Sequence, residues 1–79
     1  MIKTKILIDS VDKVKRFSSI MSVEGADCEL IEGVHIMDAK SIMGIFSMDL
    51  AKPIQLNIHS DNEPANAEIL KKLAEFIVE

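Results

Sequence analysis

Cysteine and aromatic residues are scarce in this chain. It has one cysteine, no tryptophan, no tyrosine and three phenylalanines among 79 residues. The single thiol, Cys28, excludes an internal disulfide framework, so we expect a protein of the reducing cytoplasm. Few flat rings are available on which nucleic-acid bases stack, and the net charge of −4 leaves no broad cationic face for phosphates. We therefore expect no nucleic-acid partner.

Long apolar runs, glycine and proline are also rare. No stretch approaches the roughly 20 apolar residues of a membrane-spanning helix, and residues 1–5 begin a strand rather than a signal peptide. No membrane association is expected. With three glycines, two prolines and no repeat, linker or low-complexity segment, residues 1–79 predict a single domain. The 48% hydrophobic content can supply a core at a length near the lower limit for one.

Hydrophobic periodicity divides the chain into seven elements. Alternation predicts strands over residues 2–8, 27–31, 34–37 and 54–60. A helical period predicts helices over residues 12–23 and 65–78, with a short helix opened by Ser41. Glu32-Gly33 is a candidate two-residue hairpin, and the last helix is expected to bury Leu73 and Phe76. The order β-α-β-β-α-β-α predicts an α+β fold: an antiparallel sheet covered by helices on one side, an open-faced sandwich.

Residues 40–48, with the sequence Lys-Ser-Ile-Met-Gly-Ile-Phe-Ser-Met, are the most informative segment. The Ser41 hydroxyl can cap the short helix, and a phosphate there would be stabilised by the helix N-terminus with Lys40 beside it. Ile42, Met43 and Phe46 exceed what one short helix can bury, so part of that surface is a candidate docking patch. The local pattern by itself favours the alternative, a capped connector helix whose apolar residues all face the core.

The same segment carries a family resemblance. Residues 41–48, followed by Leu50-Ala51-Lys52, resemble the regulatory-serine region of HPr, the small phosphocarrier of the bacterial sugar phosphotransferase system. The match continues in register over nearly the whole chain. It implies an HPr-like open-faced β-sandwich, with a four-stranded antiparallel sheet covered on one face by three helices. It also implies a serine kinase acting at Ser41, and a transcriptional regulator or metabolic enzyme contacting Lys40, Ile42, Met43 and Phe46.

The other half of the family signature is missing. The family has its phosphorylated histidine just before the first helix, followed by a small residue, arginine and proline. Here Lys13 stands where the histidine should be, Lys15 where the arginine should be, and Arg16 where the proline should be. A lysine, with a pKa of about 10.4, is almost wholly protonated near pH 7 and has no lone pair for a phosphoryl group. The chain thus resembles the histidine-less Crh branch of the family, and we expect a regulatory protein rather than an enzyme.

Several alternatives stay open. Lys13, Lys15 and Arg16 form either a cationic cluster that binds an anion or a solvated basic turn. Another residue, such as Asp12, could carry a phosphoryl group in place of the histidine. The chain could also be an orphan structural or oligomeric domain, such as a homodimer, that is never phosphorylated.

The two histidines do not replace the missing one. His35 and His59 are expected on the strand phase that points away from the apolar face. No C-x-x-C or H-x-x-x-H spacing is present, so no metal and no cofactor are expected. Asp49 stands where the family usually has glycine, and its carboxylate would oppose a phosphate on Ser41 if it points toward that site.

Overall fold

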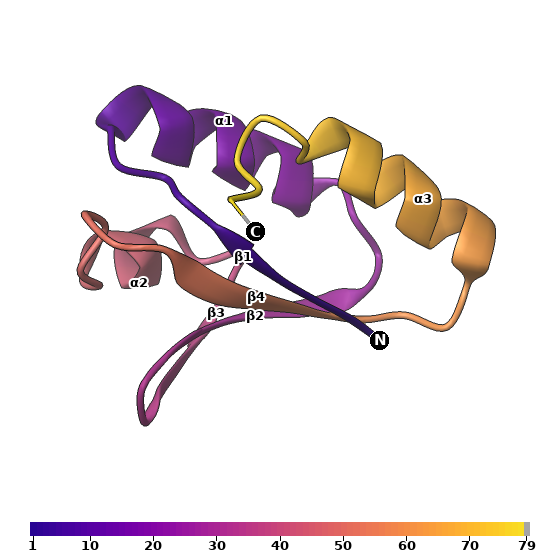
Figure 1. Cartoon of the computed structure of the whole chain (residues 1–79), viewed down its shortest axis with the longest axis horizontal. Coiled ribbons are helices and arrows are strands. Elements are labelled where there is room, and N and C mark those ends of the chain that lie inside the picture. The colour runs from indigo at the N-terminus through magenta and orange to yellow at the C-terminus, as the bar shows by residue number, and fades with distance from the viewer. Residues whose placement is uncertain (79) are drawn as a thin grey trace.

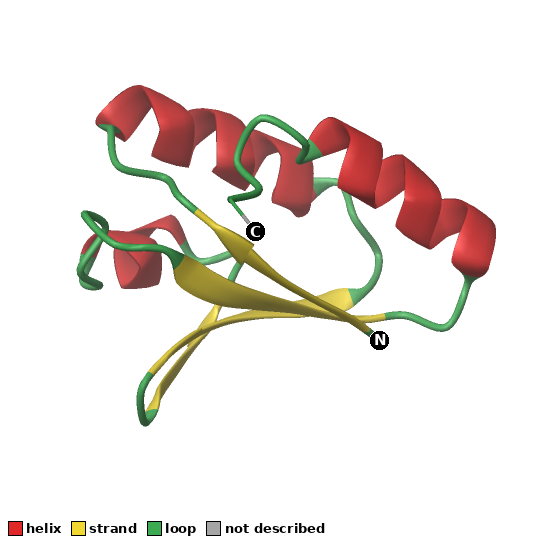
Figure 2. Ribbon diagram, in the orientation of Figure 1, coloured by secondary structure: helices red, strands yellow, loops and turns green. Residues whose placement is uncertain are grey.

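The computed structural model describes residues 1–78. Four strands form one antiparallel sheet in the order β1-β4-β2-β3, and the three helices lie on one side of it (Figures 1 and 2). The elements are β1 (Ile2–Ile6), α1 (Val11–Ser22), β2 (Asp27–Glu32), β3 (His35–Asp38), α2 (Ile42–Phe46), β4 (Ile54–His59) and α3 (Glu63–Lys72). This is the open-faced α+β sandwich that the periodicity predicts. Within residues 1–78, no helix has the length and apolar character needed to cross a membrane.

The hydrophobic core lies between the sheet and the helices. From α1 it receives Val14, Phe17 and Met21, which share one helical stripe and are fully buried. From the strands it receives side chains at alternating positions: Ile6, Leu30, Ile54, Leu56 and Ile58. The rings of Phe17 and Phe76 meet edge to face with their centroids 6.0 Å apart, a favourable aromatic geometry. The helical repeat of 3.6 residues in α1 and the two-residue alternation in the strands therefore both place their apolar side chains in the same core.

The hairpin between β2 and β3 is shifted by one residue from its prediction. The turn consists of Gly33 and Val34 rather than Glu32 and Gly33, because Glu32 already pairs with His35. Gly33 has a φ of 60°, and no residue other than glycine has a positive φ in the described chain. These signs fit a type II′ turn, which takes glycine at its first central position. Because side chains alternate along a strand, the shift turns Met37 toward the helices and Ile36 toward the open face.

The C-terminal end also differs from the prediction. Helix α3 ends at Lys72 rather than continuing to Val78. Leu73 and Phe76 are fully buried as predicted, but they lie in the turns that follow the helix.

Residues 76–78, called the C-terminal segment below, then run along the outer edge of β1. The backbone N–H of Leu7 donates to the Phe76 carbonyl at 2.8 Å, and that of Val78 donates to the Lys5 carbonyl at 3.0 Å. Ile6 lies opposite Ile77 in an antiparallel bridge. In Figure 1 this yellow end of the chain lies against β1. The C-terminal segment therefore covers one of the two edges of the sheet.

Candidate functional site

Ser41 caps α2 as its sequence predicts. Its backbone is extended, with φ −94° and ψ 102°, and its hydroxyl oxygen accepts the N–H of Gly44 at 3.3 Å. At the other end of the helix, the Ser47 hydroxyl donates to the Gly44 carbonyl at 2.6 Å. Both serines are exposed to solvent. A helix of five residues is thus held at both ends by side-chain hydroxyls, which supply partners that such a short helix lacks.

The apolar residues around Ser41 remain largely outside the core. Ile42, Met43 and Phe46 have exposed fractions of 38%, 82% and 45%, whereas Ile45 is fully buried. Phe46 lies four positions after Ile42 and three after Met43, spacings that make helical side chains neighbours, so the three exposed residues form one surface next to Ser41. We call this surface the α2 patch. One residue of the helix anchors it to the core, and three face outward.

Lys40 is engaged elsewhere. Its ammonium donates to the Glu24 carbonyl, just beyond the end of α1, at 2.7 Å. Its backbone N–H donates to the Asp38 carboxylate at 2.9 Å. A cation near a helix C-terminus interacts favourably with the carbonyls exposed there. Lys40 therefore ties the loop before α2 to the end of α1, and the sequence carries no local signal for this contact because 16 positions separate the two residues.

Asp49 is also engaged, at the end of α2 remote from Ser41. One carboxylate oxygen accepts the backbone N–H of Ala51 at 3.1 Å, and the other lies 4.0 Å from the Lys52 ammonium. The backbone N–H of Asp49 donates to the Glu32 carboxylate at 3.2 Å. The Asp49 carboxylate therefore points toward residues 51 and 52 of the following loop and away from Ser41.

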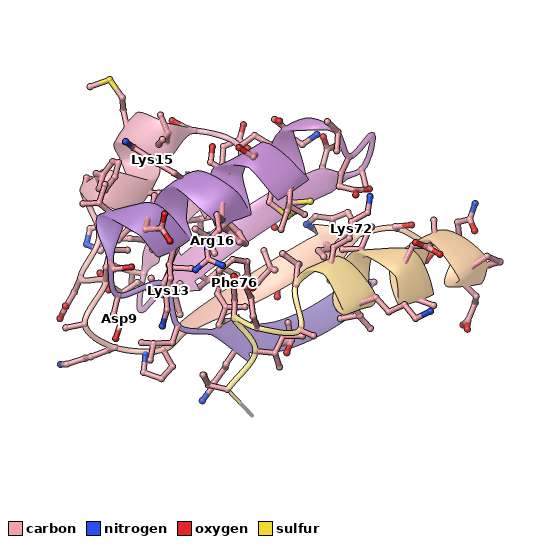
Figure 3. All side chains as sticks on the ribbon, turned by 90° about the horizontal axis from the view of Figure 1, so that it is seen from above. Asp9, Lys13, Lys15, Arg16, Lys72 and Phe76 are labelled. Carbon is pink, nitrogen blue, oxygen red and sulfur yellow. The ribbon has the colours of Figure 1, made fainter. Side chains whose placement is uncertain are left out.

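The cations at the start of α1 do not gather into one cluster. In Figure 3 the side chains of Lys13 and Lys15 point to opposite sides of α1, and Arg16 lies beside Phe76. Lys15 and Arg16 line one shallow cavity together with Glu75, which does not include Lys13. The Lys13 ammonium donates to Asp9 at 3.0 Å, and this hydrogen bond holds the pKa of the Asp9 carboxyl below its usual value. An ion-paired ammonium offers no lone pair for phosphotransfer.

Arg16 is shared between two carboxylates. Its Nε lies 3.1 Å from Asp12, and its Nη1 forms an ion pair with Glu75. Its guanidinium carbon also lies 5.9 Å from the centre of the Phe76 ring, within cation–π range. Asp9 pairs with Lys13, while Asp12 and Glu75 both pair with Arg16, and no ion pair within residues 1–78 involves Lys15. Three acids thus offset the charge of the three cations, which favours the solvated basic turn over an anion site. Nothing in the local sequence pairs Arg16 with Glu75, which lies near the other end of the chain.

The histidines lie on opposite faces of the sheet. His59 is on the open face, as expected, with its Nε2 2.6 Å from the Glu29 carboxylate. The expectation for His35 is wrong: it shares the phase of Leu30 and Met37 and lines a small cavity with Ser47 and Met48, on the helix side. The one-residue shift of the hairpin explains the difference. Among residues 1–78, no three His, Cys, Asp or Glu side chains are grouped so that they could hold a metal ion.

Comparison with known proteins identifies the fold. No family model matches the chain, and a search of curated proteins finds no similar sequence. Among solved structures, the crystal structure of HPr-C-His from Thermoanaerobacter tengcongensis superimposes with a TM-score of 0.74. The two sequences are 23% identical, and the match covers 95% of this chain and 89% of the other. Their likeness extends over the whole sandwich, and the chain therefore has the HPr-like fold that the resemblance of residues 41–52 implies.

Proposed function

We propose that this protein is a regulatory binding module that docks through the α2 patch and is controlled by phosphorylation of Ser41. The observation that carries the proposal is the combination on one short helix of an exposed capping serine and three exposed apolar side chains. Large apolar side chains grouped on the surface of a small domain mark interaction sites. The partner is a protein with an apolar surface, such as a transcriptional regulator or a metabolic enzyme, and the module works in the cytoplasm.

The contacts of Ser41 support its role as the control point. A phosphate there adds close to two negative charges directly beside the apolar side chain of Ile42. Such a charge must be desolvated or paired before a partner can cover the α2 patch, so it changes the affinity of the complex. The backbone N–H of Gly44 already points at the Ser41 oxygen, and the Asp49 carboxylate is occupied in its own loop. The phosphate thus gains a donor and is not opposed by Asp49.

Treatment with an HPr serine kinase and ATP tests the proposal directly. We expect the protein to gain one phosphate, and peptide mapping by mass spectrometry to place it on Ser41. The Ser41→Ala variant should gain none. The matched control is Ser47→Ala, at the other end of the same helix, which should be labelled like the parent. A true HPr, phosphorylated in parallel, is the positive control. If it is labelled and this protein is not, or is labelled at another residue, the proposal is wrong.

The second candidate is an orphan structural or oligomeric domain that is never phosphorylated. It is favoured by one observation outside the α2 patch: the edge of the sheet at β3 has no partner strand within residues 1–78. A phosphocarrier that uses another residue has less support, because Lys13 and Arg16 are ion-paired and Asp12 shares Arg16.

A further inference from the structure

The two edges of the sheet differ. The outer edge of β1 is covered by the C-terminal segment, through two backbone hydrogen bonds and the bridge between Ile6 and Ile77. Strand β3, at the other end of the order β1-β4-β2-β3, has one neighbour, β2, in the part of the chain that the structure describes. Open strand edges offer unpaired N–H and C=O groups to another strand. The outer edge of β3, called the free edge below, is therefore the place where a further strand could pair.

The register of β2 and β3 determines which backbone groups point outward. The N–H of Ala39 donates to the Cys28 carbonyl at 3.0 Å, which fixes the phase of hydrogen-bonded pairs in this ladder. In an antiparallel ladder these pairs alternate with non-bonded ones, so His35 and Met37 direct their backbone groups toward β2. Ile36 and Asp38 direct theirs away from it. The Asp38 carbonyl accepts the N–H of Ser41 at 3.0 Å, which leaves the Asp38 N–H and both groups of Ile36 at the free edge.

The edge strand β3 is short, with four residues, and its one acidic side chain is Asp38 at its end, but it lacks the other usual protections against pairing. Natural edge strands carry lysine, proline or a bulge to prevent association, and β3 has the sequence His-Ile-Met-Asp in regular register. Ile36 is 61% exposed on the open face and lies opposite Ile31 of β2. Val34, in the adjoining turn, is 92% exposed.

We propose that β3 pairs antiparallel with β3 of a second copy of this chain, with Ile36 opposite Ile36 of the partner subunit. A two-fold axis perpendicular to the sheet keeps the two open faces on the same side, so residues of the same phase must lie opposite each other. In this register the two Ile36 residues exchange both backbone hydrogen bonds. Each Asp38 N–H also donates to the carbonyl of Val34 of the partner subunit. The two sheets become one continuous sheet.

Charge and hydrogen bonding select this register over its neighbours. It places Asp38 opposite Val34 of the partner subunit, so no like charges face each other, and it joins two Ile31–Ile36 pairs into one apolar row. A register centred on Asp38 would bring two carboxylates together, which is unfavourable. A register centred on Met37 would require the Asp38 carbonyl, which is already bonded to Ser41. The edge is thus complementary to itself, which favours a second copy over an unrelated peptide.

Sedimentation equilibrium over a range of concentrations tests the pairing. A contact made by one short strand is small, so we expect a weak dimer, present at millimolar and absent at low micromolar concentration. Ile36→Lys, which puts an edge-protecting residue at an exposed position, should leave a monomer at every concentration. Met43→Lys, at an apolar residue on α2 that is 82% exposed and lies away from the free edge, is the control for adding a lysine and should dimerise like the parent.

Hydrogen exchange of the unmodified protein gives a second readout that does not depend on a variant. The amides of Ile36 and Asp38 should become more protected as concentration rises, while those of His35 and Met37 stay unchanged. A monomer at millimolar concentration would overturn the proposal, as would a dimer lost in Met43→Lys but kept in Ile36→Lys. The pairing does not rest on the function proposed for Ser41, because kinase labelling and sedimentation report on different surfaces.

Discussion

Among single residues, Cys28 has a titration that differs between the folded and unfolded chain. It lies on β2 with 3% of its surface exposed, and burial raises the pKa of its thiol to about 11, with the nearby Lys40 partly opposing the shift. The folded protein therefore keeps a neutral thiol at a pH where the unfolded chain, with a pKa of 9.0, loses the proton. The folded state is favoured by this group below pH 9 and loses that advantage as pH rises toward 11.

We therefore expect the free energy of unfolding to fall between pH 9 and pH 11. The Cys28 contribution to this slope is at most about 1.4 kcal/mol per pH unit. Urea unfolding at pH 8, 9 and 10 measures it, and Cys28→Ala is the control because other groups titrate in the same range. An equal slope in parent and variant would show that Cys28 does not carry the effect.

Ser41 contributes to stability through its hydrogen bond to Gly44. Ser41→Ala removes the cap, and we expect it to lower the free energy of unfolding by about 1 kcal/mol. Ser41→Asp keeps an acceptor at the same position and should unfold within a few tenths of a kcal/mol of the parent. Ser19→Ala, at an exposed position in α1, is the control for a serine that does not cap. A lower urea midpoint for Ser41→Asp than for Ser41→Ala would show that a negative charge at this position is repelled, and a phosphate on Ser41 would then be repelled as well.

At the scale of the elements, the turns after α3 are part of the core although they have no regular secondary structure. Phe76 is fully buried, packs edge to face on Phe17 and lies beneath Arg16. Phe76→Ala should therefore cost about 3–5 kcal/mol. Chains of this length have a total stability of only about 5 kcal/mol, so the variant should be close to unfolded at room temperature.

Thermal unfolding by circular dichroism measures the loss. Val78→Ala is the control: its side chain is exposed, and the backbone N–H that donates to Lys5 is kept. A Phe76→Ala variant that melts within a few degrees of the parent would contradict the packing described for the C-terminal segment.

The same turns show what the sequence could and could not predict. Leu73 and Phe76 are three positions apart, a spacing that a helix and a series of tight turns share. Periodicity thus identifies both as buried but does not locate the end of α3. At β3, apolar residues occupy both phases, with Val34 and Ile36 on one and Met37 on the other, and Gly33 suits two neighbouring turns. A one-residue ambiguity in the turn then reverses the faces of the strand.

For the candidate site too, local features could be predicted from the sequence and long-range contacts could not. The cap at Ser41 follows from local sequence, but the exposure of Ile42, Met43 and Phe46 does not, because the local pattern fits a connector helix with its apolar residues in the core equally well. The contacts of Lys40 with Glu24 and of Arg16 with Glu75 join distant parts of the chain, and only the packing of the elements brings them together. The ion pair between Arg16 and Glu75 is one reason why the start of α1 is a neutralised turn rather than a cationic cluster, and the sequence gives no sign of it.

For the molecule as a whole, we expect no phosphoryl transfer through the start of α1. Incubation with phosphoenolpyruvate and enzyme I should leave the mass unchanged, because Lys13 is an ammonium paired with Asp9. Lys13→His should restore little, since Arg16 remains bound to Asp12 and Glu75. A true HPr serves as the positive control. An acid-labile phosphate on the parent, or rapid labelling of Lys13→His, would show that the neighbouring residues matter less than their contacts indicate.

The bridge between Ile6 and Ile77 also bears on the order of events during synthesis. Strand β1 leaves the ribosome early, yet its partners are β4 and the C-terminal segment, so it has nothing to pair with until residues 54–59 and then 76–78 have followed. Helix α1 and the β2–β3 hairpin involve local contacts and can form sooner. Pairing over such long sequence separations is slow, because a large loop must close before the contact is gained. Until those residues have been synthesised, β1 remains unpaired and the side chain of its Ile6 lacks the core neighbours that bury it in the folded protein.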